Sequence, residues 1–424
     1  MKLLVVSPDF ASHYGPLSIV ASAARRAGHH IVVATGATMR SRVLEEGFEW
    51  RPLRLGAESN GGVAEPGPAI RRFLDATRAG AAATIRHQAA ERERDLLWEP
   101  ERVAADLLAL IDDVDPDQIL VDHVSFGSTL GVYASGRPFV TLVPGHPSQL
   151  PVGDERYGIP PDWPRGWRPT KPVLDELEHL ADRVTGAMTE RWNEALNALS
   201  VERAPVEDVT RVHGDRVLFN AVAEFQHPDR LARMPVGSRF VGPLTRRPAS
   251  TPTTGSGSSR PLVYVAFGTF LSHRDDVLAE VAGALRSLDV RAAIALGQTP
   301  ADRLGRIPDD WIIGSHLPQV ELLERAVLAV HHGGNNSVQE SLAAGVRQII
   351  MPFSTDQFAN AADLERLGRA TVVDPNDVDV DALTTVVDAA VTSPPPECVL
   401  PPGDSQLADA IATGVTEREP FRSA

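Results

Sequence analysis

The sequence predicts an α/β protein made of two doubly wound domains that face each other across a central cleft. Continuous apolar runs, with the length of strands buried in a parallel sheet, alternate with amphipathic segments along the chain. A stretch rich in Ser, Thr, Pro and Gly at 245–260 interrupts this alternation, and Leu262 then restarts it with a strand, a turn and a helix. With 424 residues, the chain is also too long for one typical core.

The interruption gives the expected domain boundaries. Residues 1–243 form an N-terminal domain, 244–260 a flexible linker and 261–405 a C-terminal domain, and 406–424 remain as a C-terminal segment.

The chain opens with a strand, a loop and a helix. Leu3–Ser7 and Ile31–Thr35 are expected to be the first two buried strands. A polar loop follows the first of them and carries His13. Pro16 then suits the first turn of a helix, and Gly28 lies beyond the end of that helix.

Further elements complete the first domain. Residues 66–97 are expected to be largely helical, with a charged end (ERERD) that faces solvent, and Glu101–Ile111 to form another helix. Gln118–Asp122 and Pro138–Val143 have the composition of further buried strands.

A long segment crowded with Pro, Gly and Trp follows, at 145–172. Ordered loops of this length are more often functional than structural filler. We therefore take His146, Tyr157, Trp163 and Trp167 as candidates for contact with a bound molecule. A static lid packed on the domain is an equal alternative.

Composition excludes several function classes. The net charge is −15 and no block is dense in Lys or Arg, which argues against nucleic acid or an anionic membrane as the main partner. The one cysteine, Cys398, allows neither an intramolecular disulfide nor a cysteine metal cluster. The apolar run at the N-terminus is too short for a signal peptide, and no segment has membrane-spanning length, so a cytoplasmic protein is expected.

The most informative segment is 331–361. Gly333 and Gly334 allow a close turn after an apolar run, and a helix that includes Ser337 is expected to run to Gly345. The unpaired N–H groups and positive dipole of a helix start attract phosphate, and His332 lies beside them. The alternative is that Ser337 and Glu340 only form a capping box.

A second polar turn follows in the same segment, before a helix expected at Asn360–Leu367. In it, Asp356 and Gln357 can hold adjacent hydroxyls of a sugar, because one accepts hydrogen bonds and the other both donates and accepts. Alternatively, Asp356 caps the helix, and Ser354 with Gln357 forms a capping box.

This segment resembles the donor motif of the inverting, nucleotide-sugar-dependent glycosyltransferases that include plant natural-product and bacterial antibiotic enzymes. Their motif runs approximately H-x-G-x-N-S-x-x-E, then G-x-P, then a Pro and D-Q-x-x-N-A. The matching residues are His332, Gly334, Asn336, Ser337, Glu340, Gly345, Pro352, Asp356, Gln357, Asn360 and Ala361.

The resemblance implies the two-domain, Rossmann-like GT-B fold. It makes the first domain the acceptor-binding one and the second the nucleotide-sugar-binding one, with the last segment packed back across the first domain. It also implies that His332, Gly334, Asn336 and Ser337 bind the diphosphate, with Gly268 and Thr269 as a second backbone approach. Glu340 would accept from the ribose, and Asp356 and Gln357 would hold the hexose. Because helix N–H groups neutralise the leaving charge, neither a metal nor another cofactor is expected.

The N-terminal half supplies the expected base. His13 follows the first strand, at the cleft edge of a doubly wound sheet, in a setting similar to the family's G-H-x-x-P-L pattern. The resemblance makes it the base that deprotonates the acceptor; taken alone, a surface histidine is the commoner interpretation. Asp122, at the end of its strand, could orient His13, or merely cap the strand end. His123 should point the other way.

The loop expected to bind the nucleobase departs from the pattern. Where the family has W-x-P-Q, this chain has His316-Leu317-Pro318-Gln319, so the stacking surface is smaller and the sequence leaves both UDP and TDP open. Arg347 also replaces the usual proline of G-V-P, and Asn335 stands where plant enzymes often have Trp.

We therefore predict a hexosyltransferase that moves a hexose or deoxyhexose to a hydroxyl, or other nucleophile, of a small bacterial natural product. The partners would be the donor and the acceptor, and the protein a monomer or homodimer. Two alternatives are a nucleotide-sugar epimerase or hydrolase on the same fold, and a non-catalytic helper subunit of a transferase. A dehydrogenase is the least favoured, since no G-x-G-x-x-G follows the first strand.

Overall fold

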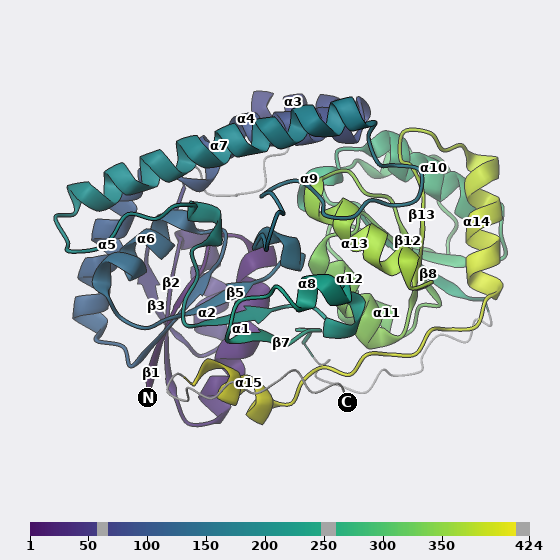
Figure 1. Cartoon of the computed structure of the whole chain (residues 1–424). Helices are drawn as coiled ribbons and strands as arrows, with labels where there is room; N and C mark the ends of the chain where they lie inside the picture. The colour runs from purple at the N-terminus through teal and green to yellow at the C-terminus, as the bar shows by residue number, and fades with distance from the viewer. Residues whose placement is uncertain (57–66, 247–259, 413–424) are drawn as a thin grey trace.

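The computed structural model describes residues 1–56, 67–246 and 260–412, and within them the chain forms two α/β domains built on parallel sheets (Figure 1). The first sheet has the strand order β3-β2-β1-β4-β5-β6-β7 in the described residues. Its strands are β1 Lys2–Val6, β2 His30–Thr35, β3 Glu49–Pro52, β4 Gln118–Asp122, β5 Val140–Val143, β6 Arg216–Phe219 and β7 Ser238–Phe240.

The second sheet has the order β10-β9-β8-β11-β12-β13 in the described residues, and every pairing in both sheets is parallel. Its strands are β8 Leu262–Ala266, β9 Arg291–Ala295, β10 Ile312–Gly314, β11 Leu328–His331, β12 Arg347–Ile350 and β13 Ala370–Val372.

Both sheets reverse their strand order at their first strand. In the first sheet β1 pairs with both β2 and β4, and in the second β8 pairs with both β9 and β11. At such a switch point a crevice lies outside the carboxyl ends of the strands. Ligands bind in this crevice in doubly wound sheets. The fold therefore directs attention to the turns after β1, β4, β8 and β11.

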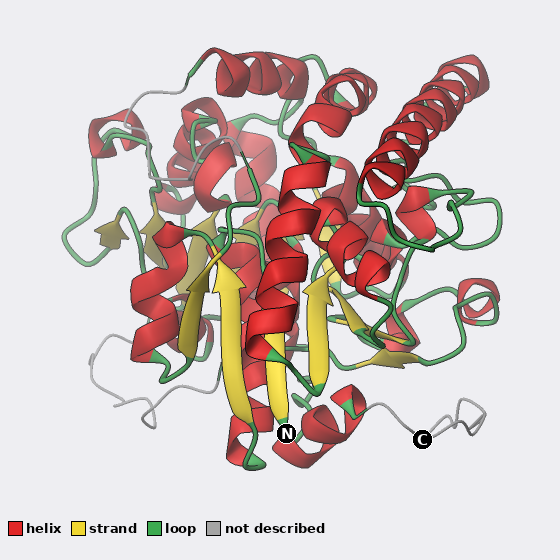
Figure 2. Ribbon diagram, turned by 90° about the vertical axis from the view of Figure 1, so that its left-hand side faces the viewer, coloured by secondary structure: helices red, strands yellow, loops and turns green. Residues whose placement is uncertain are grey.

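Helices lie on both sides of the first sheet, as Figure 2 shows, and the long α7 runs beside α4 along the top of Figure 1. The helices of this half are α1 Ala11–Arg26, α2 Arg40–Glu45, α3 Pro68–Arg78, α4 Ala81–Leu96, α5 Pro100–Val114, α6 Phe126–Ser135, α7 Lys171–Ala198 and α8 Pro228–Leu231. Those of the second half are α9 Gly268–Leu271, α10 Asp275–Arg286, α11 Gln319–Leu323, α12 Asn335–Ala344, α13 Thr355–Arg366, α14 Val380–Thr392 and α15 Asp404–Ile411. Short 3-10 turns are η1 Ala37–Met39, η2 Pro147–Gln149, η3 Val209–Arg211, η4 Ala223–Phe225 and η5 Ala301–Leu304.

The start of α1 differs from the sequence expectation. The helix begins at Ala11 rather than at Pro16, so His13 lies in its first turn and not in a loop. Pro16 is inside the helix, where it has no N–H to donate to the carbonyl of Ser12 four residues earlier. That carbonyl instead accepts a hydrogen bond from Asn336 Nδ2 at 2.9 Å, from the other domain.

The start of α13 is also earlier than expected, at Thr355 instead of Asn360. The reason is the capping box that Ser354 and Gln357 form, because it begins the helix before Asp356. The end of α12 is as expected, since Gly345 adopts the left-handed conformation (φ 65°) that stops the helix.

The C-terminal segment returns from the second domain to the first, running along the bottom of Figure 1 to α15 beside α1. Arg26 on α1 forms an ion pair with Asp404, and Leu407 and Ile411 join the buried core shared with α1 and β1. Residues 413–424, the rest of the predicted returning segment, lie outside the described residues. No helix in the described ranges combines the length and apolar character needed to cross a lipid bilayer.

Replacing Leu407 should therefore destabilise the N-terminal domain. Leu407 is 2% exposed, so Leu407→Ala is expected to lower the free energy of unfolding by about 2–4 kcal/mol, measured by urea denaturation. Leu400→Ala is the control, because Leu400 lies in the same segment but is 76% exposed. Equal midpoints for the two variants would show that α15 does not contribute to this core.

Candidate active site

His13 and Asp122 meet at the switch point of the first sheet. His13 lies after β1 and Asp122 ends β4, and the distance from Nδ1 of the imidazole to Oδ2 of the carboxylate is 2.9 Å. Asp122 is fully buried, and its other oxygen accepts a hydrogen bond from the Val124 backbone N–H at 3.0 Å. The side chain of His13 keeps 25% exposure, so its other ring nitrogen remains available toward the cleft.

The surroundings of His13 raise its pKa above the ordinary value. Burial opposes the charged imidazolium, but attraction to Asp122, the hydrogen bond that the ring donates to its carboxylate and a further attraction to Asp356 outweigh that penalty. The pKa of His123, the next residue after Asp122, shifts in the opposite direction. Burial lowers its pKa to about 4, and its Nε2 lies 2.7 Å from the carbonyl oxygen of Gln149, away from His13's carboxylate partner.

A cavity of about 730 Å³ separates His13 from the second domain. Most of the residues predicted to bind the donor line this cavity together with His13. They are Gly268, His316, His332, Gly334, Asn336, Ser337, Asp356 and Gln357. The predicted residues outside its lining are Asp122, which lies behind His13, and Gln319 and Glu340, which lie behind Ser337. The side chain of Thr269 lies outside the described residues.

The turn between β11 and α12 is built on two glycines. Gly333 has φ 87°, which side chains rarely adopt. At Gly334, a Cβ atom would lie 2.3 Å from Nε2 of His332, so only glycine lets the helix start approach that ring. The first N–H groups of α12 therefore face the cavity beside an imidazole.

His332 is neutral at physiological pH. Burial lowers its pKa to about 4, which a contact with the Ala266 backbone offsets only in part. The imidazole beside the first N–H groups of α12 is therefore an uncharged group.

Ser337 and Glu340 do not form the capping box that the sequence allowed, because the N-cap of α12 is Gly334 and both residues lie within the helix. Their side chains meet Gln319 at the start of α11. Its Nε2 donates to Glu340 Oε2 at 2.5 Å and lies 3.4 Å from Ser337 Oγ, while Tyr264 Oη donates to Gln319 Oε1 at 3.0 Å. Burial raises the pKa of Glu340, so this polar cluster is held in a desolvated wall.

The sequence offered two interpretations of this turn, sugar binding and helix capping. Gln357 and Asp356 each fit a different one. Gln357 does cap α13, because its Oε1 accepts from the backbone N–H groups of Phe353 at 2.9 Å and Ser354 at 3.2 Å. Asp356 faces the cavity. Burial raises its pKa, with the nearby His146 and His13 lowering it in part.

The two domains are joined directly across the cleft. Nδ2 of Asn335 donates to the carbonyl oxygens of Pro144 and Asn220, each at 2.7 Å, and the neighbouring Asn336 bonds to Ser12. In the sequence, Asn335 was notable only because plant enzymes often have Trp at this position. No local pattern shows that it bridges the domains.

The segment 145–172 holds the four candidate acceptor residues, and three of them pack against other side chains of the protein. Both ring nitrogens of His146 are engaged, by Ser148 and by Asp363 Oδ2 at 3.1 Å across the domain interface. Trp163 stacks on Phe358 of α13 with ring centroids 5.5 Å apart, and Trp167 tilts against the same ring at 5.8 Å. These three residues are packed as the lid alternative describes, and their direct contact with a bound molecule stays a prediction.

Tyr157 is the fourth candidate, and it lines a second cavity of about 350 Å³. This cavity shares Phe73, Gln88, Gln149 and Asp356 with the larger one, so the two are continuous. The sequence did not identify Phe73, Gln88 or Gln149, because their convergence depends on how α3, α4 and η2 pack.

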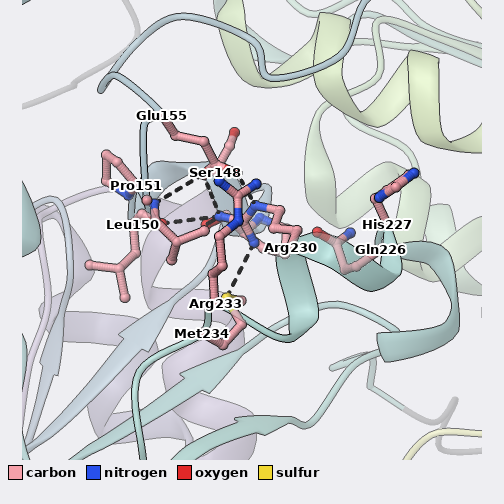
Figure 3. Close-up of polar contacts among 12 residues, drawn as sticks. Ser148, Leu150, Pro151, Glu155, Gln226, His227, Arg230, Arg233 and Met234 are labelled. Carbon is pink, nitrogen blue, oxygen red and sulfur yellow. Dashed lines mark hydrogen bonds and ion pairs between the residues drawn. The ribbon is translucent and has the colours of Figure 1, made fainter.

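Arg230 of α8 holds the loop that carries Gln149 and Tyr157 (Figure 3). It is 4% exposed, forms an ion pair with Glu155 at 2.9 Å, and donates to the backbone oxygens of Pro147 and Leu150 at 2.8 and 3.0 Å. A buried guanidinium with all these acceptors fixes the loop that carries Gln149 and Tyr157 at the cavity.

Metal ligands are not grouped in the described ranges, where no three His, Cys, Asp or Glu side chains gather closely enough to hold an ion. The polar residues that line the cleft are Ser, Thr, Asn, Gln and His together with two carboxylates, Asp9 and Asp356.

Comparisons with known proteins identify a matching family model and several similar proteins. The C-terminal domain family of erythromycin biosynthesis protein CIII-like proteins matches residues 279–412. Over 380 residues, the chain is 27% identical to 4'-demethylrebeccamycin synthase of Lentzea aerocolonigenes, with 85% of each protein covered. It is 24% identical to demethyllactenocin mycarosyltransferase of Streptomyces fradiae, over 68% of this chain and 60% of that protein.

Solved structures show the same fold. The glycotransferase of kitacinnamycin superposes with a TM-score of 0.68 at 21% identity, covering 97% of this chain and 92% of that one. The glycosyltransferase VinC in complex with DTDP superposes with a TM-score of 0.65 at 19% identity, covering 97% and 94%. The chain is thus similar, over most of its length, to antibiotic-type nucleotide-sugar-dependent glycosyltransferases and has the GT-B fold, and it is an enzyme that transfers a glycosyl group to a small molecule.

Proposed function

We propose that this enzyme moves a hexose or deoxyhexose from a UDP- or TDP-sugar to a hydroxyl of a natural-product acceptor, with inversion at the anomeric carbon. One observation carries the proposal: the His13–Asp122 pair faces the N-terminal end of α12 across a cavity lined by both domains. A base on one side and an anion-binding helix start on the other are what a single in-line displacement requires.

His13 is the proposed base. Its nitrogen toward the cleft takes the acceptor proton, and Asp122 holds the other ring nitrogen and stabilises the imidazolium that forms. Asp122 reaches the acceptor only through His13, so it is a positioning residue. The acceptor oxygen then attacks the anomeric carbon as the bond to the diphosphate breaks.

The start of α12 is the proposed diphosphate site. The first backbone N–H groups of the helix, together with the neutral imidazole of His332, stabilise the charge that develops on the leaving group. Gly268, with φ 72°, offers a second close backbone approach from the turn after β8. In this proposal the protein supplies the neutralising groups itself, so no metal is required.

Other residues are proposed to select the donor. Glu340, held by Gln319, accepts from the ribose hydroxyls, and His316 stacks on the nucleobase. Asp356 accepts from the hexose, while Gln357 can contribute only its amide nitrogen, because its oxygen caps α13. The DTDP bound to VinC supports a thymidine nucleotide as the donor class.

The acceptor-free alternatives have less support. A sugar epimerase or hydrolase needs no second cavity beside the base, and a helper subunit needs no base at all. This chain has a second cavity continuous with the first, and its histidine is held by a buried carboxylate. Transfer of TDP-glucose or UDP-glucose to a panel of phenols and alcohols, followed by mass spectrometry of the products, tests the proposal directly.

Removing the base should stop transfer without affecting donor binding. His13→Ala is expected to lower the transfer rate about 10²- to 10⁴-fold, because proton removal is lost, while TDP still raises the melting temperature as in the native protein. His179→Ala, on the exposed side of α7, is the control. Near-normal turnover by His13→Ala would exclude His13 as the base.

Removing the orienting carboxylate should lower the pKa of His13. In Asp122→Asn the attraction and the charged hydrogen-bond acceptor disappear, so the imidazole stays neutral down to a lower pH, which nuclear magnetic resonance titration of its ring signals measures. Asp117→Asn removes a carboxylate from just before the other end of the same strand and serves as the control. An unchanged titration in Asp122→Asn would contradict the assigned pairing.

The diphosphate site should tolerate no side chain at its first turn. Gly334→Ala places a methyl group against the buried His332 ring, so we expect the thermal shift produced by TDP to be lost. Gly186→Ala on α7 has open space around the new Cβ and should leave that shift intact. If Gly334→Ala bound TDP normally, the nucleotide would have to lie elsewhere.

A further inference from the structure

Arg92 is a buried cation without an anionic partner. Three arginines are buried in the described part of the chain, and two of them, Arg230 and Arg274, pair with Glu155 and Asp276. Arg92, on α4, is 7% exposed and has no carboxylate partner among the described residues. The sequence placed it in a charged helix end expected to face solvent, and the structure corrects this: α4 turns Arg92 inward, under the loop that follows β5.

The contacts of Arg92 leave part of its guanidinium open. Nη1 donates to the carbonyl oxygen of Tyr157 at 3.1 Å, and the guanidinium carbon lies 4.9 Å from the centre of the Tyr157 ring. A Cβ atom on Gly158 would lie 1.9 Å from Nη2, so the glycine makes room for the guanidinium. Nε and Nη2 have no hydrogen-bond partner among the described residues.

The open edge of Arg92 belongs to the 350 Å³ cavity that adjoins the catalytic cleft. The walls of this cavity are partly apolar, with Ile70, Phe73, Ile159 and Pro160 among them. It meets the larger cavity at Gln88, Gln149 and Asp356, and His13 lines that larger cavity. A molecule with an apolar body can therefore extend from Arg92 towards the base.

The other charges of this cavity do not neutralise Arg92. Glu91 and Asp95 both form ion pairs with Arg94, and Asp356 is at the end of the cavity shared with the donor site. Burial lowers the pKa of Arg92, which means that its charge is held at a cost in free energy in the empty site. A ligand that brings an anion into this cavity recovers that cost and adds a charge-assisted, two-point hydrogen bond.

We propose that Arg92 binds a carboxylate of the acceptor, so that the enzyme selects apolar acceptors that carry an acidic group at the end opposite the reacting hydroxyl. This inference rests on the proposed function in one respect only, the identification of the second cavity as the acceptor site. Arg92 sets the choice of acceptor and takes no part in the displacement.

A matched pair of probes tests the proposal by binding alone. The probes are 6-hydroxy-2-naphthoate, which has a carboxylate and a hydroxyl at opposite ends, and its methyl ester, and calorimetry measures their affinities for the full chain saturated with TDP. The native protein is expected to bind the acid about 10- to 100-fold more tightly than the ester, as a charged hydrogen-bonded pair requires. Equal affinities would overturn the proposal.

Variants then assign the preference to Arg92. Arg92→Met keeps the length of the side chain and should reduce the acid to the affinity of the ester, while Arg92→Lys should retain part of the preference. Arg86→Met removes a cation from the same helix, where Arg86 pairs with Glu176 outside the cavity, and should change neither affinity. An undiminished preference in Arg92→Met would refute the assignment.

The design separates this inference from the proposed transfer reaction. The native acid and ester affinities decide it even if Arg92→Met does not fold, and no turnover is measured. If His13→Ala kept its activity while the acid preference depended on Arg92, the base would be wrong and the carboxylate site right. If transfer to neutral phenols were normal and the acid were not preferred over the ester, the transfer reaction would be right and the carboxylate site wrong.

Discussion

The direct contact between the start of α12 and the first turn of α1 is the interaction on which the rest of the site depends. It consists of the hydrogen bond from Asn336 Nδ2 to the carbonyl of Ser12, next to the proposed base and the proposed anion-binding turn. That carbonyl is available because Pro16 lacks the N–H that would otherwise satisfy it within the helix. A proline inside α1 thus costs one helical hydrogen bond and leaves a carbonyl free for one between domains, in the turn that carries His13 opposite the proposed diphosphate site.

Burial in this cleft acts on two imidazoles in opposite directions. His13 and His332 line the same cavity, and desolvation disfavours the charged form of each. His13 has a buried carboxylate at 2.9 Å and its pKa rises, whereas His332 has none among the described residues and its pKa falls to about 4. One ring is thereby prepared to take up a proton and the other to remain neutral beside an anion. Both histidines follow a strand, so their place in the sequence does not distinguish them. The carboxylate beside His13 does, because it reverses the direction of the pKa shift.

The elements that were predictable from sequence are those set by local patterns. The strand Gln118–Asp122 was predicted with its observed bounds, and Gly345 ends its helix as expected, because apolar runs and left-handed glycines act locally. The starts of α1 and α13 were missed, since a cap and an internal proline permit more than one starting residue. The pairing of His13 with Asp122 was predictable, because both follow strands at one switch point.

The residues on the acceptor side could not be predicted in the same way, because their positions depend on contacts between domains. Trp163 and Trp167 had the composition of a ligand platform, yet both pack on Phe358, which lies two residues after Asp356 on α13. This packing joins the loop that carries Tyr157 to the helix that carries the proposed sugar-binding carboxylate. A change of position in one therefore moves the other, so the proposed acceptor and sugar sites share one contact. The composition of the loop indicated that it matters, and only the tertiary packing shows that its tryptophans join the two proposed substrate sites without lining either of the two continuous cavities.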